Sequence, residues 1–217
     1  MTNTETAYEK WDEVWATETG RANWLDPLPD VIACAERLRS QGARTVLDLG
    51  CGVGRHALVL AKMGFDVTAL DASQSGLDEV HKSAEALGVE LKTVPGLMTE
   101  LPFEDGSFDY VVSINVIYHG APDVVKRAVS EISRVLVSEG TFQGTLLSKR
   151  RSDYGLGEEI APDTFVRPDE DGDKSHPHYF CNGAELVQVL ENFELRSLED
   201  VGDDGSWHWH FVAERTW

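Results

Sequence analysis

The sequence predicts an α/β fold with a doubly wound sheet of seven strands, mostly parallel, that ends in an antiparallel C-terminal hairpin strand. Two observations carry this prediction. Between residues 44 and 147, short β-forming runs alternate with amphipathic helical runs, as they do in parallel sheets with right-handed crossover helices. Near the C-terminus, two more β-forming runs flank a Gly-Asp-Asp-Gly turn at 202–205, and this spacing is typical of a hairpin.

Bulk composition limits the class of protein. A chain of 217 residues with 41% hydrophobic residues suits a single domain, residues 1–217, with a sizeable core. No apolar run approaches ~20 residues, so we expect no membrane partner. The net charge of −19 disfavours nucleic acid, because such a surface repels phosphates. The chain should act as a monomer or a homodimer.

Three scattered cysteines and the N-terminal residues indicate the compartment. Cys34, Cys51 and Cys181 are odd in number and far apart, which suits free thiols better than a disulfide framework. The first residues are polar and acidic and do not have the pattern of a signal peptide. We therefore expect a cytoplasmic protein.

The N-terminal segment, residues 1–43, is expected to be helical. Tyr8, Trp11 and Trp15 recur at helical spacing and predict an amphipathic helix over 7–17. A second helix is expected from Leu28 to Gln41, where Gly42 follows as the terminating residue. The aromatic helix either packs on the sheet as a structural element or forms a lid over a ligand, and we assign it as a lid.

The alternating segment, residues 44–147, is expected to form a ligand-binding core. Ser73 is placed to cap a helix, and glycines follow two helical runs. The expected strands are 45–49, 66–70, 90–94, 108–114 and 141–147, and the expected helices are 55–63, 73–87 and 122–137.

Residues 148–182 interrupt this alternation of strands and helices. They are rich in Asp, Gly and Pro, and a connection of this length is usually functional or disordered, so we assign it as an inserted loop that contacts a substrate. Asn182 and Glu185 form a capping box for a helix to Asn192. This helix and strands near 194–201 and 207–214 make up the C-terminal segment, 183–217.

The stretch Val46–Gly54 reads Val-Leu-Asp-Leu-Gly-Cys-Gly-Val-Gly. A buried strand runs into a loop with glycine at every second position. Glycine tolerates positive φ and allows a ligand close to the backbone, and open α/β sheets bind ligands at the carboxyl ends of their strands. The spacing differs from the Gly-x-Gly-x-x-Gly pattern of dinucleotide-binding folds.

This stretch resembles the first motif of class I S-adenosylmethionine-dependent methyltransferases. The similarity extends over roughly residues 44–147 and includes Val67–Ser73, Leu101–Phe103 with Gly106–Asp109, and Arg134–Leu136. The resemblance implies a Rossmann-like sheet, S-adenosylmethionine as cofactor and S-adenosylhomocysteine as product.

The chain also resembles the type 11 and 12 methyltransferase groups, and two looser similarities point to methylation of small molecules. Trp11, Trp15, Gly20 and Trp24 are similar to the opening of thiopurine and thiol methyltransferases. The glycine loop together with residues 64–72 looks like the tellurite-resistance type.

The resemblance implies roles for nine cofactor-binding residues. Gly50 and Gly52 would lie against the methionine part, Asp48 near its amino group, and Asp71 would accept hydrogen bonds from both ribose hydroxyls. Asp71 has an alternative role as a helix-dipole partner. Leu97 stands where the family often has an acid, so Leu97 and Met98 would enclose the adenine while backbone groups make the polar contacts, or Leu97 simply packs in the core. The complete set is Trp11, Asp48, Gly50, Gly52, Asp71, Ala72, Leu97, Met98 and Asn115.

The segment Asn115–His119 follows the fourth strand, where the family's loop borders cofactor and acceptor. His119 is the candidate catalytic base, because imidazole titrates near neutral pH, although a histidine there can also be only a hydrogen-bonded cap. Tyr118 is the second candidate catalytic residue.

Two His-x-His pairs, His176 with His178 and His208 with His210, allow a metal site. They show no recognised zinc spacing, so we expect no metal. Instead, these histidines and Tyr179 are expected to shape the acceptor pocket.

The predicted function is methyl transfer from S-adenosylmethionine to a small molecule, at sulfur or another soft nucleophile. The alternatives are an N- or O-methyltransferase of a small metabolite, a non-catalytic protein that binds S-adenosylmethionine, and a nucleotide-binding oxidoreductase. The glycine spacing argues against the last of these.

Overall fold

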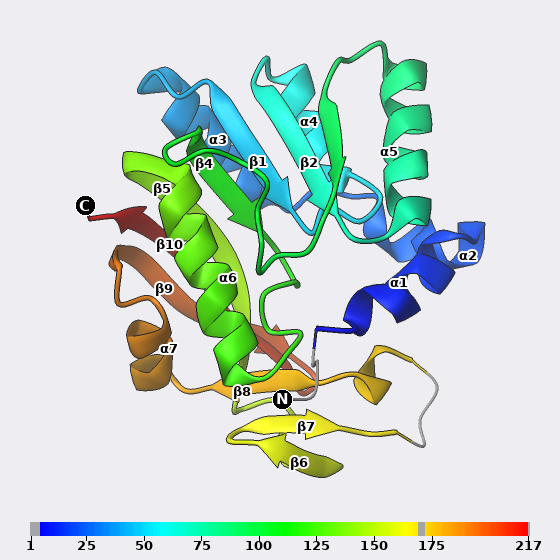
Figure 1. The fold of residues 1–217 in the computed structure, drawn as a ribbon, viewed down its shortest axis with the longest axis vertical. Helices are drawn as coiled ribbons and strands as arrows, with labels where there is room; N and C mark the ends of the chain where they lie inside the picture. Colours follow the sequence, from blue (N-terminus) through cyan, green and yellow to red (C-terminus); the bar gives the residue numbers. More distant parts are fainter. Residues whose placement is uncertain (1–4, 169–171, 217) are drawn as a thin grey trace.

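The computed structural model describes residues 5–168 and 172–216. Its central sheet begins with five strands in the order β3-β2-β1-β4-β5, all paired in parallel. The order reverses direction at β1, which makes the sheet doubly wound, as predicted (Figure 1). These strands are β1 (Thr45–Leu49), β2 (Asp66–Asp71), β3 (Lys92–Pro95), β4 (Phe108–Ser113) and β5 (Leu136–Ser148).

The C-terminal hairpin continues the sheet beyond β5. It consists of β9 (Phe193–Asp203) and β10 (Ser206–Arg215). The last strand, β10, lies between β5 and β9 and runs antiparallel to both. The predicted antiparallel C-terminal strand is therefore confirmed.

The predicted count of seven strands is too low, because the described chain contributes ten strands to the sheet. The three further strands come from the insertion, which was expected to be a loop: β6 (Glu158–Ala161), β7 (Thr164–Val166) and β8 (His178–Cys181). β4 ends at Ser113, opposite Gly144. The end of β5 therefore has a free edge, and Leu147 and Ser148 pair there in parallel with β8.

The helices form where capping and turn residues predict them. Ser73 accepts a hydrogen bond from Gly76 N at the start of α5, and Gly88 ends that helix in the left-handed conformation. The Asn182–Glu185 capping box is present at α7. The helices are α1 (Ala7–Trp15), α2 (Glu18–Arg21), α3 (Pro29–Ser40), α4 (Arg55–Lys62), α5 (Gln74–Leu87), α6 (Pro122–Val135) and α7 (Gly183–Val189), with 3-10 turns η1 (Ala22–Trp24) and η2 (Asp173–Ser175).

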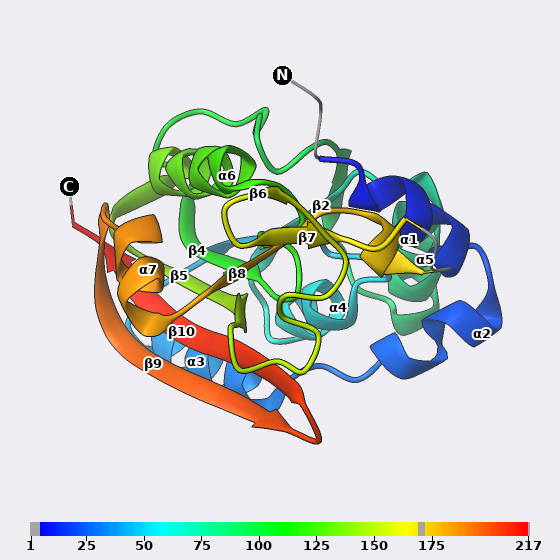
Figure 2. The same cartoon turned by 90° about the horizontal axis from the view of Figure 1, so that it is seen from below.

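Two hydrophobic cores lie on the two faces of the sheet. Successive residues of a strand point to opposite faces, so Val46 packs with side chains of α3, α4 and α5, while Leu47 packs with side chains of α6 and α7. Both residues are fully buried. Figure 2 shows α6 and α3 on opposite sides of the strands.

The carboxyl ends of the parallel strands point toward α1 and the insertion (Figure 1). This edge therefore carries the glycine loop, the N-terminal helix and strands β6 to β8. None of the described helices combines the length and the apolar character needed to cross a membrane.

Candidate functional site

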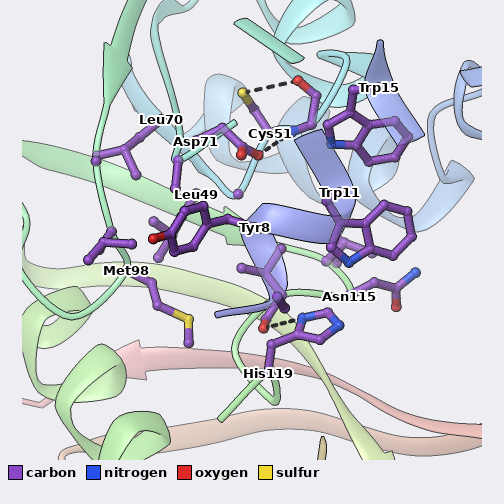
Figure 3. A pocket seen from close by; sticks show the side chains of 18 of the residues that line it. Tyr8, Trp11, Trp15, Leu49, Cys51, Leu70, Asp71, Met98, Asn115 and His119 are labelled. Atoms are coloured by element: carbon purple, nitrogen blue, oxygen red, sulfur yellow. Dashed lines mark hydrogen bonds between the residues drawn. The ribbon is translucent and has the colours of Figure 1, made fainter. Parts of the chain in front are cut away.

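A cavity opens at the carboxyl ends of β1, β2 and β4, beside α1 (Figure 3). It holds about 860 Å³ of empty space, part of it open solvent, which is within the range of small-molecule sites. The lining residues are Glu5, Ala7, Tyr8, Trp11, Trp15, Trp24, Leu49, Gly50, Cys51, Gly52, Arg55, His56, Leu70, Asp71, Ala72, Gly96, Leu97, Met98, Ile114, Asn115, Val116 and His119.

The glycine loop forms a cradle that side chains would fill. Gly50 has a φ of +69°, and a Cβ added there would lie 2.4 Å from Val116 Cγ2. Gly52 has a φ of +53°, and its Cβ would lie 3.1 Å from the Trp15 ring. Both positions therefore need glycine for backbone conformation and for space. A ligand at this loop can approach the main chain directly.

The carboxylate of Asp71 lies at the cavity beside this loop. Its Oδ2 accepts from Gly52 N at 2.7 Å and its Oδ1 from Ser73 N at 2.8 Å. Burial raises the pKa of Asp71, and these backbone donors partly offset the effect. The backbone of Ala72 contributes a third bond, and since a carboxylate has about four acceptor positions, acceptor capacity is left for a ligand hydroxyl. The bond to Ser73 shows that Asp71 also supports the start of α5.

Asp48 lies outside the set of lining residues, unlike the other eight residues expected to bind the cofactor. Its Oδ2 accepts from Ala57 N at 2.8 Å in the first turn of α4. Burial raises the pKa of Asp48 to about 7. The carboxylate is turned into the protein because an unsatisfied N–H of the helix start is there to bind it. Asp48 therefore supports the site from behind the glycine loop.

Arg55, which no motif singled out, lies next to that helix start and lines the cavity. Its guanidinium lies over the Trp24 ring, 5.3 Å from the centroid. In the described chain, no acidic oxygen lies within 4.0 Å of it. The cavity thus offers a cationic group to an anionic ligand.

Aromatic side chains from the N-terminal segment cover the other side of the cavity. Trp11 and Trp15 stack with centroids 4.8 Å apart, and Trp24 meets both edge-on. Ring faces of this kind attract cations through the ring quadrupole. Trp15 and Trp24 were noted as part of the sequence pattern but were not assigned to the site. Tyr8 was expected only as part of the amphipathic helix.

An aspartate attaches this aromatic helix to the core. Asp12 Oδ1 accepts from Ser73 Oγ at 2.7 Å and from Ser75 N at 2.9 Å. These bonds, the backbone bond from Ser75 first, lower the pKa of Asp12. The contact positions α1 at the start of α5, next to Asp71.

The rest of the wall combines Ala72, Leu97 and Met98 with residues that follow β4. Asn115 adopts a left-handed φ of +63°, and its N–H donates to Thr145 Oγ1 at 2.7 Å. Glu5 was not predicted; its Oε2 accepts from Thr99 Oγ1 at 2.5 Å. An isolated acid near the N-terminus carries no signal that separates it from surface acids.

His119 lines the cavity, but its free lone pair does not face it. Nδ1 lies 2.9 Å from Val116 O, which assigns the proton to Nδ1. Nε2 is buried, has no hydrogen-bond partner among the described residues and lies 3.6 Å from Asp173 Oδ2. In this orientation, His119 cannot take a proton from a ligand in the cavity unless its ring rotates.

Tyr118 lies behind His119 and does not line the cavity. Its ring centroid is 4.5 Å from that of His119, 5.9 Å from His178 and 6.1 Å from His208. Burial raises the pKa of the Tyr118 phenol, so the phenolate is disfavoured.

One histidine of each His-x-His pair, His178 and His208, therefore lies near Tyr118. No described residue of 148–182, Tyr179 included, lines the cavity, and neither does His208 or His210. The N-terminal segment forms this side of the cavity, and the expectation that these residues shape the acceptor pocket stays a prediction. The insertion reaches the cavity wall through the contact between Asp173 and His119.

Comparisons with known proteins identify the family. A family model described as a methyltransferase domain matches residues 46–140. A cypemycin N-terminal methyltransferase from a Streptomyces species is 37% identical over an alignment of 228 positions, which covers 94% of this chain and 89% of that protein. A sterol 24-C-methyltransferase from Gibberella zeae is 41% identical over 181 residues, but the chain spans only 44% of its length.

A solved structure shows the same fold. The 1,6-didemethyltoxoflavin-N1-methyltransferase from Burkholderia thailandensis superimposes with a TM-score of 0.73, covering 100% of this chain and 92% of that chain at 21% identity. The cradle at Gly50 and Gly52 and the remaining acceptor capacity of Asp71 fit a nucleoside with a neighbouring charged group. Because the identity with the Streptomyces protein spans nearly all of both chains, this chain belongs to the class I S-adenosylmethionine-dependent methyltransferases, with S-adenosylmethionine as cofactor and S-adenosylhomocysteine as product.

Proposed function

We propose that this enzyme transfers a methyl group to a small-molecule acceptor, at sulfur or another soft nucleophile. The observation that carries the proposal is that Asp71 and His119 lie on opposite sides of one aromatic cavity (Figure 3). A cofactor anchored at Asp71 and the glycine cradle leaves the side near His119 and Trp11 for the acceptor.

Cofactor contacts follow from the lining residues. In this proposal Asp71 accepts from the ribose hydroxyls, Gly50 and Gly52 allow the methionine part close to the backbone, and Arg55 binds its carboxylate. The Trp11 ring faces the sulfonium. Ala72, Leu97, Met98 and Asn115 enclose the remaining edges, and Asp48 acts through the start of α4.

The chemistry asks the protein mainly for alignment. When bound, S-adenosylmethionine supplies a methyl carbon that carries a good sulfur leaving group. The acceptor's lone pair forms the new bond to that carbon while the old carbon–sulfur bond breaks, and the acceptor's proton is released to solvent. Holding the reacting atoms ~3–3.5 Å apart removes several kcal/mol from the barrier.

A sulfur acceptor is favoured because the histidines of the cavity are not poised as bases. The lone pair of His119 faces Asp173, and His56 Nε2 accepts from Leu28 N at 3.3 Å. Burial lowers the pKa of His56 to about 3. A thiol has some thiolate at neutral pH and is strongly nucleophilic, so it needs the least assistance.

A nitrogen acceptor is the second candidate. The Streptomyces relative, which covers 94% of this chain, is by name a cypemycin N-terminal methyltransferase. A primary or secondary amine would need a base, and His119 with Tyr118 behind it would be the group to supply one after a ring rotation.

The test combines binding and turnover. Calorimetry should show binding of S-adenosylmethionine and none of NAD, and incubation with labelled cofactor should methylate thiols before amines, hydroxyls and carbon acids. Faster methylation of an amine or a peptide N-terminus would replace the sulfur assignment by the nitrogen one. Clear cofactor binding without turnover on any acceptor class would contradict the proposed transfer.

A further inference from the structure

Two histidines and an aspartate converge beside the cavity from distant parts of the chain. His119 follows β4, while Asp173 lies in η2 and His178 begins β8. His119 Nε2, His178 Nε2 and one oxygen of Asp173 all lie within 4.8 Å of one another. The two imidazole rings meet edge to face, with centroids 4.7 Å apart. His119 and His178 are 93% and 99% buried, as their relative exposures are 7% and 1%.

Backbone contacts fix which nitrogen of each ring faces the others. His119 Nδ1 lies 2.9 Å from Val116 O, and His178 Nδ1 lies 2.8 Å from His176 O. Each carbonyl accepts a proton from its Nδ1, so each neutral ring has its lone pair on Nε2. Both lone pairs point at the same oxygen, Asp173 Oδ2, at 3.6 Å and 3.0 Å.

Three electron-rich atoms facing one another need a cation between them. His119 Nε2 shows directly that a cation is missing, because it is a buried nitrogen without a hydrogen-bond partner among the residues that the structure describes. A proton can bridge only two of these three atoms at a time. A metal ion can bind all three atoms. In addition, a metal-binding histidine usually donates its other N–H to a carbonyl or carboxylate, as both rings do here.

We infer that His119, Asp173 and His178 form a binding site for a divalent first-row transition metal such as Zn²⁺. Ligands about 2.1 Å from such an ion are separated by roughly 3.0–3.5 Å. The separation of 3.0 Å between His178 Nε2 and Asp173 Oδ2 lies in this range, and that of 3.6 Å between His119 Nε2 and Asp173 Oδ2 lies just above it. Two imidazoles and one carboxylate suit zinc or ferrous iron rather than Mg²⁺ or Ca²⁺, which prefer oxygen. This inference replaces the expectation of no metal. It uses only one member of the His-x-His pairs, together with the histidine that was expected to be a base.

The ion would hold the insertion to the cavity wall. His119 is a lining residue, whereas Asp173 and His178 belong to the segment that leads into β8. With three protein ligands, the site keeps a further coordination position for water or another ligand. The inference does not depend on methyl transfer, because metal binding is measured without cofactor or acceptor.

Calorimetric titration of the full chain, freed of metal by a chelator, tests the site with Zn²⁺ as the probe. One Zn²⁺ should bind per chain, and Mg²⁺ should not bind. Loss of a residue that only supports a ligand costs 10–100-fold in affinity, so His178→Ala and Asp173→Asn should each weaken binding by at least about tenfold. His176→Ala is the matched control, because its Nδ1 contacts Thr6 Oγ1 instead, and it should bind as the unmodified protein does.

A second measurement guards against variants that misfold. Co²⁺ bound at two nitrogens and a carboxylate should give visible absorption bands, which His178→Ala should lose while its circular dichroism stays unchanged. Hydrogen exchange in 173–178 should slow on addition of Zn²⁺. Absence of Zn²⁺ binding by the unmodified chain, or equal binding by His178→Ala and Asp173→Asn, would overturn the inference in favour of a shared proton.

Discussion

At the scale of single residues, Asp71 is the residue proposed to hold the ribose of the cofactor. Replacing it with alanine removes the acceptor proposed for both ribose hydroxyls and the partner of Gly52 N. Hydrogen bonds to a charged group contribute about 1.5–3 kcal/mol, so Asp71→Ala should weaken S-adenosylmethionine binding roughly 10–100-fold by calorimetry. Asp66→Ala, at the exposed start of the same strand, where it pairs with Lys92, should leave the affinity unchanged. Equal affinity in both variants would remove Asp71 from the site.

Asp48 lies behind the glycine loop, and its burial favours the protonated form. Its folded pKa of about 7 exceeds the unfolded value of about 3.9. Between these values the folded state holds a proton that the unfolded state has lost. The free energy of unfolding should therefore fall by about 1.4 kcal/mol for each unit that pH rises in this window. Asp48→Asn keeps an acceptor for Ala57 N and should lose this slope in urea unfolding. The same slope in both proteins would show that Asp48 is ionised when folded.

At the scale of elements, α1 depends on Asp12 for its position. Asp12→Ala removes the bonds to Ser73 and Ser75, at a cost of about 1–2 kcal/mol confined to the docking of this helix. Hydrogen exchange in α1 should accelerate, and cofactor affinity should drop, because Trp11 and Trp15 lose their support. Glu13→Ala changes the next residue, which is exposed and pairs with Lys10 on the same helix, and it should change neither quantity. A drop with Glu13→Ala as large as that with Asp12→Ala would contradict the docking role.

The insertion shows what a pattern in the sequence cannot reveal. The strands of the core were predictable because buried apolar runs end at glycines, as at Val46–Gly54. β7 has only three residues and β6 is mostly exposed, so neither has a periodicity to detect. β8 forms because the edge of β5 is free beyond the end of β4, and that depends on tertiary register. The meeting of Asp173 with His119 depends on the same pairing and was missed for the same reason.

At the scale of the whole molecule, the doubly wound order and the antiparallel last strand were predictable from the alternation of elements, which restricts the possible topologies. The side of the cavity at the glycine loop and Asp71 was predictable for the same reason, since the ends of parallel strands meet at one edge. Asp48 was the exception, because its strand position does not reveal that the helix start binds its carboxylate. The side near His119 is assembled from segments that lie far apart in the chain.

The net charge of −19 is a property of the whole chain, and its effect on folding can be measured. Repulsion among surface acids destabilises the compact state, and salt screens it as the Debye length falls from ~30 Å at 0.01 M to ~8 Å at 0.15 M. The melting temperature at neutral pH should therefore rise with sodium chloride over this range. Near the pI of about 4.6, the same salt should have little effect, because the net charge is close to zero. A melting temperature that falls with salt at neutral pH would show instead that ion pairs such as Arg134 with Glu131 outweigh the repulsion.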